Sequence, residues 1–508
     1  MPPGPKVDEF VPFPVKEQFP GVDYCITSPP PWHEAMLLGF QHYLVMLGTT
    51  VIISTILVPL MGGGNEEKAR VIQTFLFVAG INTLMQVFFG TRLPTVIGGS
   101  FTYLLPTISI ILSRRYAYII DPHERFEYTM RAIQGALIAA SFFQIVVGFF
   151  GLWRIFIRFL SPLAAVPIVI LSALGLFYIG FPEYIPHMIT SRKVIFDRYA
   201  VIIVVAIVWL YAYILTLAGA YKDRPPETQY SCRTDRSGLI GGSPWIRVPY
   251  PFQWGRPIFF AGDAFAMMAA SFASLIESTG TLIAVSRFAS ATFVPPSIFS
   301  RGIGWQGIAL LLDGMFGTAN GSAPSVENAG LLALTRVGSR RVIKISACFM
   351  LFFSMLGKFG AVLASIPLPI VAALYCILFA YAASAGLGFL QFCNLNSLRN
   401  KFILGFSLFM GLSIPQYFRE YELVAGYGPV HTRSRAFNDI VNVIFSSPAT
   451  VAAIIAYSLD NSHLYWQSSV RRDSGWHWWD KFRSFRTDTR SEEFYALPYN
   501  LSKYFPSL

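Results

Sequence analysis

The sequence predicts an all-α polytopic membrane protein, and three observations support this fold class. Of its 508 residues, 54% are hydrophobic and only 13% are charged, whereas soluble domains have about a quarter charged residues. Apolar segments of roughly 20 residues recur along the chain, and a helix of that length crosses a bilayer. Two segments are interrupted by Gly and Pro at corresponding places in the two halves, which is typical of inverted-repeat transporters.

About 13 apolar segments can be recognised, six before a long polar loop and seven after it. The first half has them at about 35–61, 70–90, 95–113, 131–152, 162–181 and 198–221. The second half has them at about 258–285, 302–318, 324–337, 341–365, 367–392, 401–417 and 438–459. The connection 222–257 is dense in turn residues and marks the boundary between the halves.

The two ends of the chain are polar. Residues 1–34 are rich in Pro and carry acidic residues, so they lack the basic start and apolar run of a signal peptide. We expect the first span to direct insertion. The tail 461–508 mixes charged and aromatic residues and is either a membrane-surface segment or a solvated tail. Both ends are expected to be cytoplasmic.

Charge, cysteines and motifs exclude several classes of function. The formal charge is +11, but the basic residues fall in short loops and the tail, which favours a membrane surface over nucleic acid. The five cysteines have no metal-ligand spacing. No metalloprotease, nucleophile-elbow, P-loop or dinucleotide-binding motif is present. We therefore expect no enzyme activity, no cofactor and no metal.

The two interrupted segments predict half-length helices. One begins around Pro94, Gly98 and Gly99, and the other around Gly321 and Pro324. A half-helix starting near Glu327 would place unpaired N–H groups and the positive end of its dipole at mid-membrane, where a ligand can meet them. The alternative is two kinked helices with ordinary packing, but the matching positions favour half-helices.

Glu277 lies deep in an apolar segment, where a charge is costly unless it is paired or functional. At helical spacing it shares a face with small residues, so it should point into the protein: Ala266, Ala270, Ala273 and Thr281. The alternative is a structural hydrogen bond between helices.

Three further polar residues lie within apolar segments. Gln41 and His42 fall in the first one, and an imidazole there can relay a proton or simply pack. Asp313 is intramembrane by count, but Gly314 and Gly317 follow it, so it can equally mark a helix end.

Four stretches together resemble the nucleobase-ascorbate transporter family, also called nucleobase-cation symporter 2, and its plant members most. They are "QHYLVMLG", "GGSFTY", "IESTG" and "ENAGLLALTR". The last matches the family signature of Gln, Glu or Pro, then Asn-x-Gly, four residues, Thr and a basic residue. The resemblance runs from about Gly21 to the C-terminus.

The resemblance implies 14 segments in two inverted sevens, with a core and a gate domain that move like an elevator, and a homodimer. Core residues would be 35–152 and 258–356, and gate residues would be 153–221 and 357–460. It implies a secondary active, proton-coupled transporter in the plasma membrane, whose partners are a small-molecule nucleobase, the proton and the lipid bilayer.

The resemblance also assigns roles to residues. Glu277 and Glu327 would bind the edge of the base, and Phe101 would stack on its ring. Backbone near Ser100 would complete the pocket together with Asn328. His42 and Gln41 would couple the proton, and three residues would shape the site: Thr281, Thr335 and Arg336.

Two departures from the family pattern matter. Thr281 stands where some relatives have an ionisable residue, which affects the coupling route. Between "LFYIGFP" and "EYIPHMI" the chain lacks an apolar stretch of about one span, which agrees with 13 segments rather than 14. An odd number would put the termini on opposite sides unless the gate rearranges, and it suggests a truncated or inactive variant.

The substrate can be argued from charge. Uracil, xanthine and urate present N–H donors to carboxylates and C=O acceptors to backbone N–H groups. Ascorbate is an anion that two glutamates would repel, and the family's ascorbate branch carries Pro where this chain has Glu327. We expect a nucleobase carrier; the alternatives are an ascorbate carrier and a non-transporting member of the family.

Overall fold

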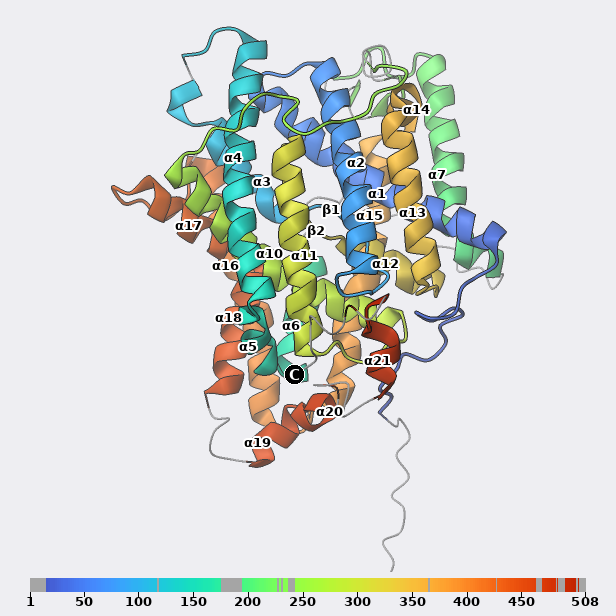
Figure 1. The fold of residues 1–508 in the computed structure, drawn as a ribbon, viewed down its shortest axis with the longest axis vertical. Helices are drawn as coiled ribbons and strands as arrows, with labels where there is room; N and C mark the ends of the chain where they lie inside the picture. The colour runs from blue at the N-terminus through green and yellow to red at the C-terminus, as the bar shows by residue number, and fades with distance from the viewer. Residues whose placement is uncertain are drawn as a thin grey trace, which may run out of the picture.

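A computed structural model describes most of the chain (Figure 1). It covers residues 15–498 and residue 501, apart from these positions: 117, 175–193, 226–227, 230–231, 236–242, 364–365, 426, 463–467, 481 and 483–488. The all-α fold class is confirmed, because the described residues form helices and only two strands of three residues each.

The first half contains helices α1 to α7 and one strand. They are α1 (Trp32–Met61), α2 (Asn65–Phe88), β1 (Ile97–Gly99), η1 (Phe101–Tyr103), α3 (Leu104–Ile111), η2 (Arg114–Tyr116), α4 (Pro122–Phe149), α5 (Leu152–Arg158), α6 (Pro162–Leu174) and α7 (Val194–Leu217).

The second half repeats this order. It contains α10 (Ala261–Phe288), α11 (Pro296–Phe316), β2 (Ser322–Pro324), α12 (Val326–Thr335), α13 (Arg340–Met355), α14 (Gly357–Leu363), α15 (Leu368–Gly388), η4 (Phe389–Phe392), α16 (Leu398–Ala425), α17 (Arg435–Ser446) and α18 (Pro448–Asn461). The tail adds α19 (Ser468–Asp473), α20 (Trp476–Asp480) and α21 (Thr489–Tyr495).

Each of the 13 apolar segments contains a helix, but not every one is a full span. Among the described residues six helices are long and apolar enough to cross a membrane, or eight if two bent pairs each count as one. One bent pair is α17 and α18, which meet at Ser447 with an 82° bend inside the predicted segment 438–459. The part of the segment 162–181 beyond Leu174, and the expected missing stretch, lie outside the described residues.

Local sequence explains where the functional helices begin. Ser325 caps α12, its hydroxyl accepting a hydrogen bond from Asn328 N at 3.2 Å. Ser447 caps α18 in the same way through Thr450 N at 3.3 Å, and Pro448 occupies the first helical position, where no N–H is needed. The bend of α17 and α18 therefore has a local cause.

The two half-helices are joined by their strands. β1 and β2 pair antiparallel, with Ile97 opposite Pro324 and Gly99 opposite Ser322. A Cβ on Gly98 would lie 1.9 Å from the Met46 methyl carbon, so glycine at residue 98 leaves room for the Met46 side chain of α1 against the strand. This crossing places the starts of α3 and α12 beside each other.

The helices pack in two groups. We call α1–α4 and α10–α13 the core helices; α4 packs on α11 and α2 on α13, and they run side by side in Figure 1. We call α6, α7, η4 and α15–α18 the gate helices, because α6, α15, α16 and α18 pack on one another. The groups meet where α12 touches α15 and where α10 touches α6, α17 and α18.

The sequence predicts either a membrane-surface segment or a solvated tail, and the structure adds that the described residues of the tail fold back onto the protein. Trp479, Ser491 and Tyr495 are buried, and Arg490 forms an ion pair with Glu17 at 3.0 Å. The two terminal segments therefore lie together on one face, at the lower end of Figure 1.

Candidate functional site

The candidate site is built where the half-helices start. Ser100 N donates a hydrogen bond to Gly321 O at 3.1 Å, and Ser325 N donates to Val96 O at 2.9 Å. These bonds continue the two-stranded pairing at both ends and bring the first turns of α3 and α12 together. Their free N–H groups carry the positive ends of two helix dipoles.

Glu277 on α10 faces this crossing, as its small-residue stripe predicted. Ala266, Ala270, Ala273 and Thr281 are all buried. One carboxylate oxygen of Glu277 accepts a hydrogen bond from the Thr102 hydroxyl in η1, and the other accepts one from the Ser447 hydroxyl at 3.1 Å. Ser447 is the bend between two gate helices, so Glu277 is held by a core hydroxyl and a gate hydroxyl at once.

Glu327 lies in the first turn of α12 and is 3% exposed. Its carboxylate accepts a hydrogen bond from the Ser325 hydroxyl at 2.7 Å. The helix of Glu277, α10, packs on α12. Two acidic side chains therefore come from neighbouring helices beside the strand crossing.

His42 is connected to the same half-helix. Its Nδ1 lies 2.8 Å from Asn328 Oδ1, and the Asn328 amide donates to the Ser325 hydroxyl at 2.9 Å. A polar chain thus runs from α1 through Asn328 and Ser325 to the Glu327 carboxylate. Through these hydrogen bonds, a change in the protonation of the carboxyl group can affect the imidazole.

Phe101 and Ser100 lie at the start of the first half-helix, and both are 8% exposed. The Ser100 hydroxyl accepts a hydrogen bond from Thr102 N at 3.3 Å, and Ser100 O accepts one from the Asn320 amide at 2.8 Å. The phenyl ring of Phe101 therefore extends from a backbone that is fixed on both sides.

The resemblance assigned four further residues to the substrate site, but their contacts in the structure lie outside it. The Gln41 amide donates to Arg198 O at 2.9 Å, on the gate helix α7. Thr281 and Thr335 each bond to a carbonyl one turn back in their own helices. Arg336 is exposed and ends α12 with a φ of 57°. The first half of α12 therefore reaches the site, and its last residues do not.

Sequence reasoning left out or left open several residues that build the site. Thr102 and Ser447 hold Glu277, but hydroxyls are too common in apolar helices to be singled out by pattern. Asp313, left open between two interpretations, is fully buried and accepts hydrogen bonds from Ser322 N at 2.8 Å and Ser322 Oγ at 3.0 Å. It therefore anchors the second strand.

A cavity of about 410 Å³ lies between the outer end of α3 and the gate helices α16 and α17. Its polar lining includes Glu422, His431 and Asn442, and Ser109 donates a hydrogen bond to Asp439 at 3.4 Å across the two groups. The core and gate helices are thus separated on this side by a cavity with both polar and apolar lining.

The site combines hydrogen-bond acceptors with backbone donors. Two carboxylates can accept N–H groups, while the N–H groups of two helix starts can donate to carbonyl oxygens. Among the described residues, no group of three or more His, Cys, Asp and Glu side chains could hold a metal ion. The donors and acceptors together suit a small polar molecule that carries both N–H and C=O groups.

Comparisons with known proteins show the family of the chain. The sequence model of the Permease family (Xan_ur_permease) matches residues 33–189 and 184–420. Nucleobase-ascorbate transporter LPE1 of Zea mays is 67% identical over the whole of both chains. Nucleobase-ascorbate transporter 6 of Arabidopsis thaliana is 64% identical over 100% of this chain and 99% of its own.

Solved structures show a weaker likeness. The transmembrane domain of the cyanobacterial bicarbonate transporter BicA is 16% identical, with a TM-score of 0.41 over 81% of this chain and 97% of that domain. Murine Slc26a9 in its inward-facing state is 14% identical, with a TM-score of 0.44 over 84% and 68%.

The comparisons also locate a gap. The maize alignment runs over 528 positions but includes all 508 residues of this chain, so at least 20 positions have no residue here. The Permease family match breaks into two stretches that meet at residues 184–189. That break lies where the sequence predicts the loss of one gate span.

Proposed function

The chain belongs to the nucleobase-ascorbate transporter family, and we propose that it is a proton-coupled secondary transporter for nucleobases such as uracil, xanthine or urate. It is an integral, multi-pass membrane protein and not an enzyme. In this proposal the base binds between the starts of α3 and α12, within a homodimer in the plasma membrane.

The observation that carries the proposal is the pair of carboxylates, the part-buried Glu277 and the buried Glu327. Glu277 and Glu327 come from different helices and are each held by hydroxyl groups, which leaves acceptor positions free. The N–H groups of a base would satisfy these positions at short range. Ascorbate is an anion, and placing it beside two carboxylates in a desolvated site would be costly. A neutral base therefore fits better than ascorbate.

A base could also use the backbone at the half-helix starts. Its carbonyl oxygens would accept hydrogen bonds from N–H groups near Ser100 and Glu327, and Phe101 would stack on its ring. The hydroxyls of Thr102 and Ser447 would be exchanged for base N–H groups as the substrate enters. Because Ser447 belongs to the gate helices, substrate binding would loosen a contact between the two groups.

The proton would be carried by groups near the base. His42 is linked to Glu327 through Asn328 and Ser325, so protonation of either end changes the hydrogen bonds of the other. Carboxyl and imidazole groups exchange protons readily, whereas a sodium site needs a cage of oxygen ligands. We therefore expect coupling to protons and not to sodium.

Transport would proceed by an elevator motion of the core helices against the gate helices. Gly330 of α12 meets Leu378 of α15, and Gly280 of α10 meets Ile168 of α6, so close backbone contacts line the boundary. Small residues at such a boundary let two rigid groups slide without large side chains interlocking.

The test is direct uptake. Cells without endogenous carriers would express the chain and receive radiolabelled uracil, adenine, guanine, xanthine, urate and ascorbate separately. The proposal predicts saturable uptake of at least one base, with ascorbate neither transported nor competing. Ascorbate uptake that exceeds base uptake would replace the proposed substrate class.

A non-transporting function is the second candidate, and the gap near residues 184–189 favours it. α7, which follows this region, is only 17% buried in its most apolar stretch and lies at the edge of the molecule in Figure 1. A shortened gate could bind a base without moving it. Base binding to purified protein, together with no uptake by protein present at the cell surface, would support this candidate.

A further inference from the structure

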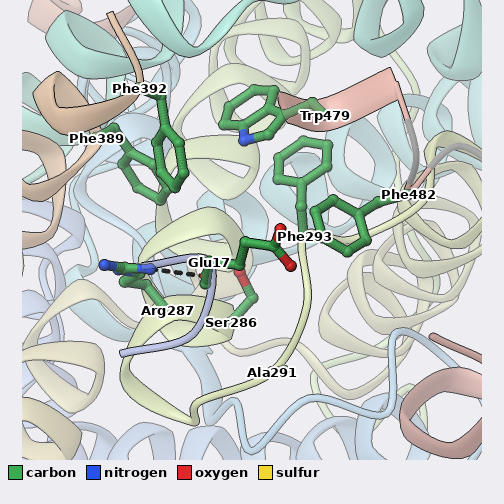
Figure 2. A pocket seen from close by; sticks show the side chains of 9 residues that line it. All are labelled: Glu17, Ser286, Arg287, Ala291, Phe293, Phe389, Phe392, Trp479 and Phe482. Atoms are coloured by element: carbon green, nitrogen blue, oxygen red, sulfur yellow. Dashed lines mark hydrogen bonds between the residues drawn. The ribbon is translucent and has the colours of Figure 1, made fainter. Parts of the chain in front are cut away.

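The two terminal segments join the core and gate helices on one face of the protein. We name residues 16–19, 473–480, 482 and 489–496 the terminal clasp. Figure 2 shows its centre, where two rings from the tail, Trp479 and Phe482, lie beside Phe293, Phe389 and Phe392. None of these residues belongs to the substrate site described above.

One end of the clasp is attached to the gate helices. Asp473 O accepts hydrogen bonds from Asn394 N at 2.9 Å and from the Asn400 amide at 2.9 Å. The Ser474 hydroxyl donates to the buried carboxylate of Asp460 at 2.8 Å. These are buried or half-buried bonds, so the start of the tail moves with the gate helices.

The other end is attached to the core helices by arginines. Three consecutive carbonyl groups at the end of α21 accept hydrogen bonds from guanidinium groups: Phe494 O from Arg340, Tyr495 O from Arg301 at 2.9 Å, and Ala496 O from Arg92. Positive groups at a helix C-terminus interact favourably with its dipole. The Tyr495 hydroxyl also donates to Thr292 O at 2.5 Å.

The N-terminal segment makes a second bridge. Arg287 of α10 donates to Lys16 O at 2.9 Å and to Glu17 O at 2.7 Å, which fixes the segment to the core helices. Lys16 N donates to the Gln391 side chain of η4 at 3.1 Å, and η4 belongs to the gate helices. Both termini therefore connect the same two groups.

Trp479 occupies the point where the groups meet. Its ring stacks on Phe293 from the core side, with 3.8 Å between ring centroids, and meets Phe389 from the gate side edge-on at 5.9 Å. The space left among the lining residues is about 10 Å³, roughly enough for one water molecule. The aromatic contact between the core and gate sides is therefore closely packed and is not a ligand pocket.

We propose that the terminal clasp restrains the core helices against the gate helices, with Trp479 as the contact that must part for the substrate site to change its access. This inference rests on the proposed transport by relative motion of the two groups. A single aromatic contact is a weak interaction, so it can slow the motion without preventing it.

The test replaces the stacked pair by Phe293→Cys and Trp479→Cys in a background without the five native cysteines. Bridging the two thiols ties the tail, and with it the gate helices, to the core helices. We expect uptake of the base found by the panel to fall at least about tenfold when the bridge forms, because sliding is blocked, and to return with reductant. Base binding to the bridged, purified protein should persist.

A second pair of cysteines tests the clasp without removing the rings of Phe293 and Trp479. Lys16→Cys with Gln391→Cys leaves Trp479 in place and bridges the N-terminal segment to η4, with the same expected block and rescue. Uptake by either fully bridged protein at the rate of its reduced form would overturn the clasp. If neither wild type nor the reduced variants bind or transport any base, the proposed function fails instead.

The aromatic contact itself is tested by Trp479→Ala, with Trp478→Ala as the matched control. Trp478 lies on the same short helix and packs on the gate ring Phe392 with centroids 5.9 Å apart. We expect Trp479→Ala to raise the maximal uptake rate per surface molecule above that of the control, with KM unchanged. Equal rates for the two variants would remove Trp479 as the restraint.

Discussion

Gly330→Ala tests the contact between the substrate-binding half-helix and the gate. A Cβ at residue 330 would lie 2.0 Å from Leu378 O and 2.7 Å from Leu378 C, whereas ordinary van der Waals contact begins at 3.4 Å. Helix α12 would have to move away from α15 by about 1.4 Å, the difference between 3.4 and 2.0 Å. Backbone atoms cannot rotate aside, so the helix itself must shift.

The free-energy cost of Gly330→Ala follows from overpacking. Forcing extra carbon atoms into a close-packed contact costs about 1–3 kcal/mol, and that range changes a conformational equilibrium by roughly 5- to 150-fold. Because α12 carries Glu327 and Asn328, the shift should disturb both the site and the sliding surface. We expect uptake per surface molecule to fall by a factor within this range, and the purified protein to melt at a lower temperature.

The matched control is Gly405→Ala, in the middle of α16, where an added Cβ meets nothing within 4 Å. This change should be neutral or slightly stabilising, because Ala favours a helix over Gly by about 0.5–1 kcal/mol. Radiolabelled uptake, surface biotinylation and thermal melting would be measured for both variants. If Gly330→Ala matched Gly405→Ala in all three, the close approach of α12 and α15 would not limit transport.

Three further predictions concern the substrate site. Glu277→Gln should abolish uptake at normal surface expression, because an amide has one acceptor oxygen where the carboxylate has two and cannot hold a negative charge; wild-type uptake would exclude the role. Glu327→Gln should keep transport but change the order of uracil, xanthine and urate in competition assays, and an unchanged order would reduce Glu327 to a helix-capping role. Uptake should fall as external pH rises and should not require sodium, since a proton is the coupled ion; sodium dependence at constant pH would contradict this.

Much of the fold was predictable because the bilayer imposes simple rules on sequence. The spans follow from runs of apolar residues, and the half-helices follow from Gly and Pro in two such runs at matching positions. Glu277, Glu327 and His42 could be singled out because an ionisable group is costly in an apolar segment. The family resemblance implied that they meet at the half-helix starts, and the structure adds the hydrogen bonds that hold them.

Other features depended on partners far away in the chain. Ser447 is one of many serines by pattern, and only the packing of α10 beside the bend of α17 and α18 places its hydroxyl on Glu277. Asp313 looked equally like a helix end until Ser322 was found bonded to it. A hydroxyl or carboxylate gains its meaning from the group that it contacts, and the sequence does not list those contacts.

The tail shows most clearly which features the sequence predicts and which depend on tertiary contacts. Its mixture of aromatic and charged residues predicted either a membrane-surface segment or a solvated tail. The structure shows that α21 packs on the protein, because Arg92, Arg301 and Arg340 converge on the three carbonyl groups that end it. Composition by itself determined that this chain lives in a membrane; only the tertiary contacts, which form between residues hundreds of positions apart, decided which groups face each other there.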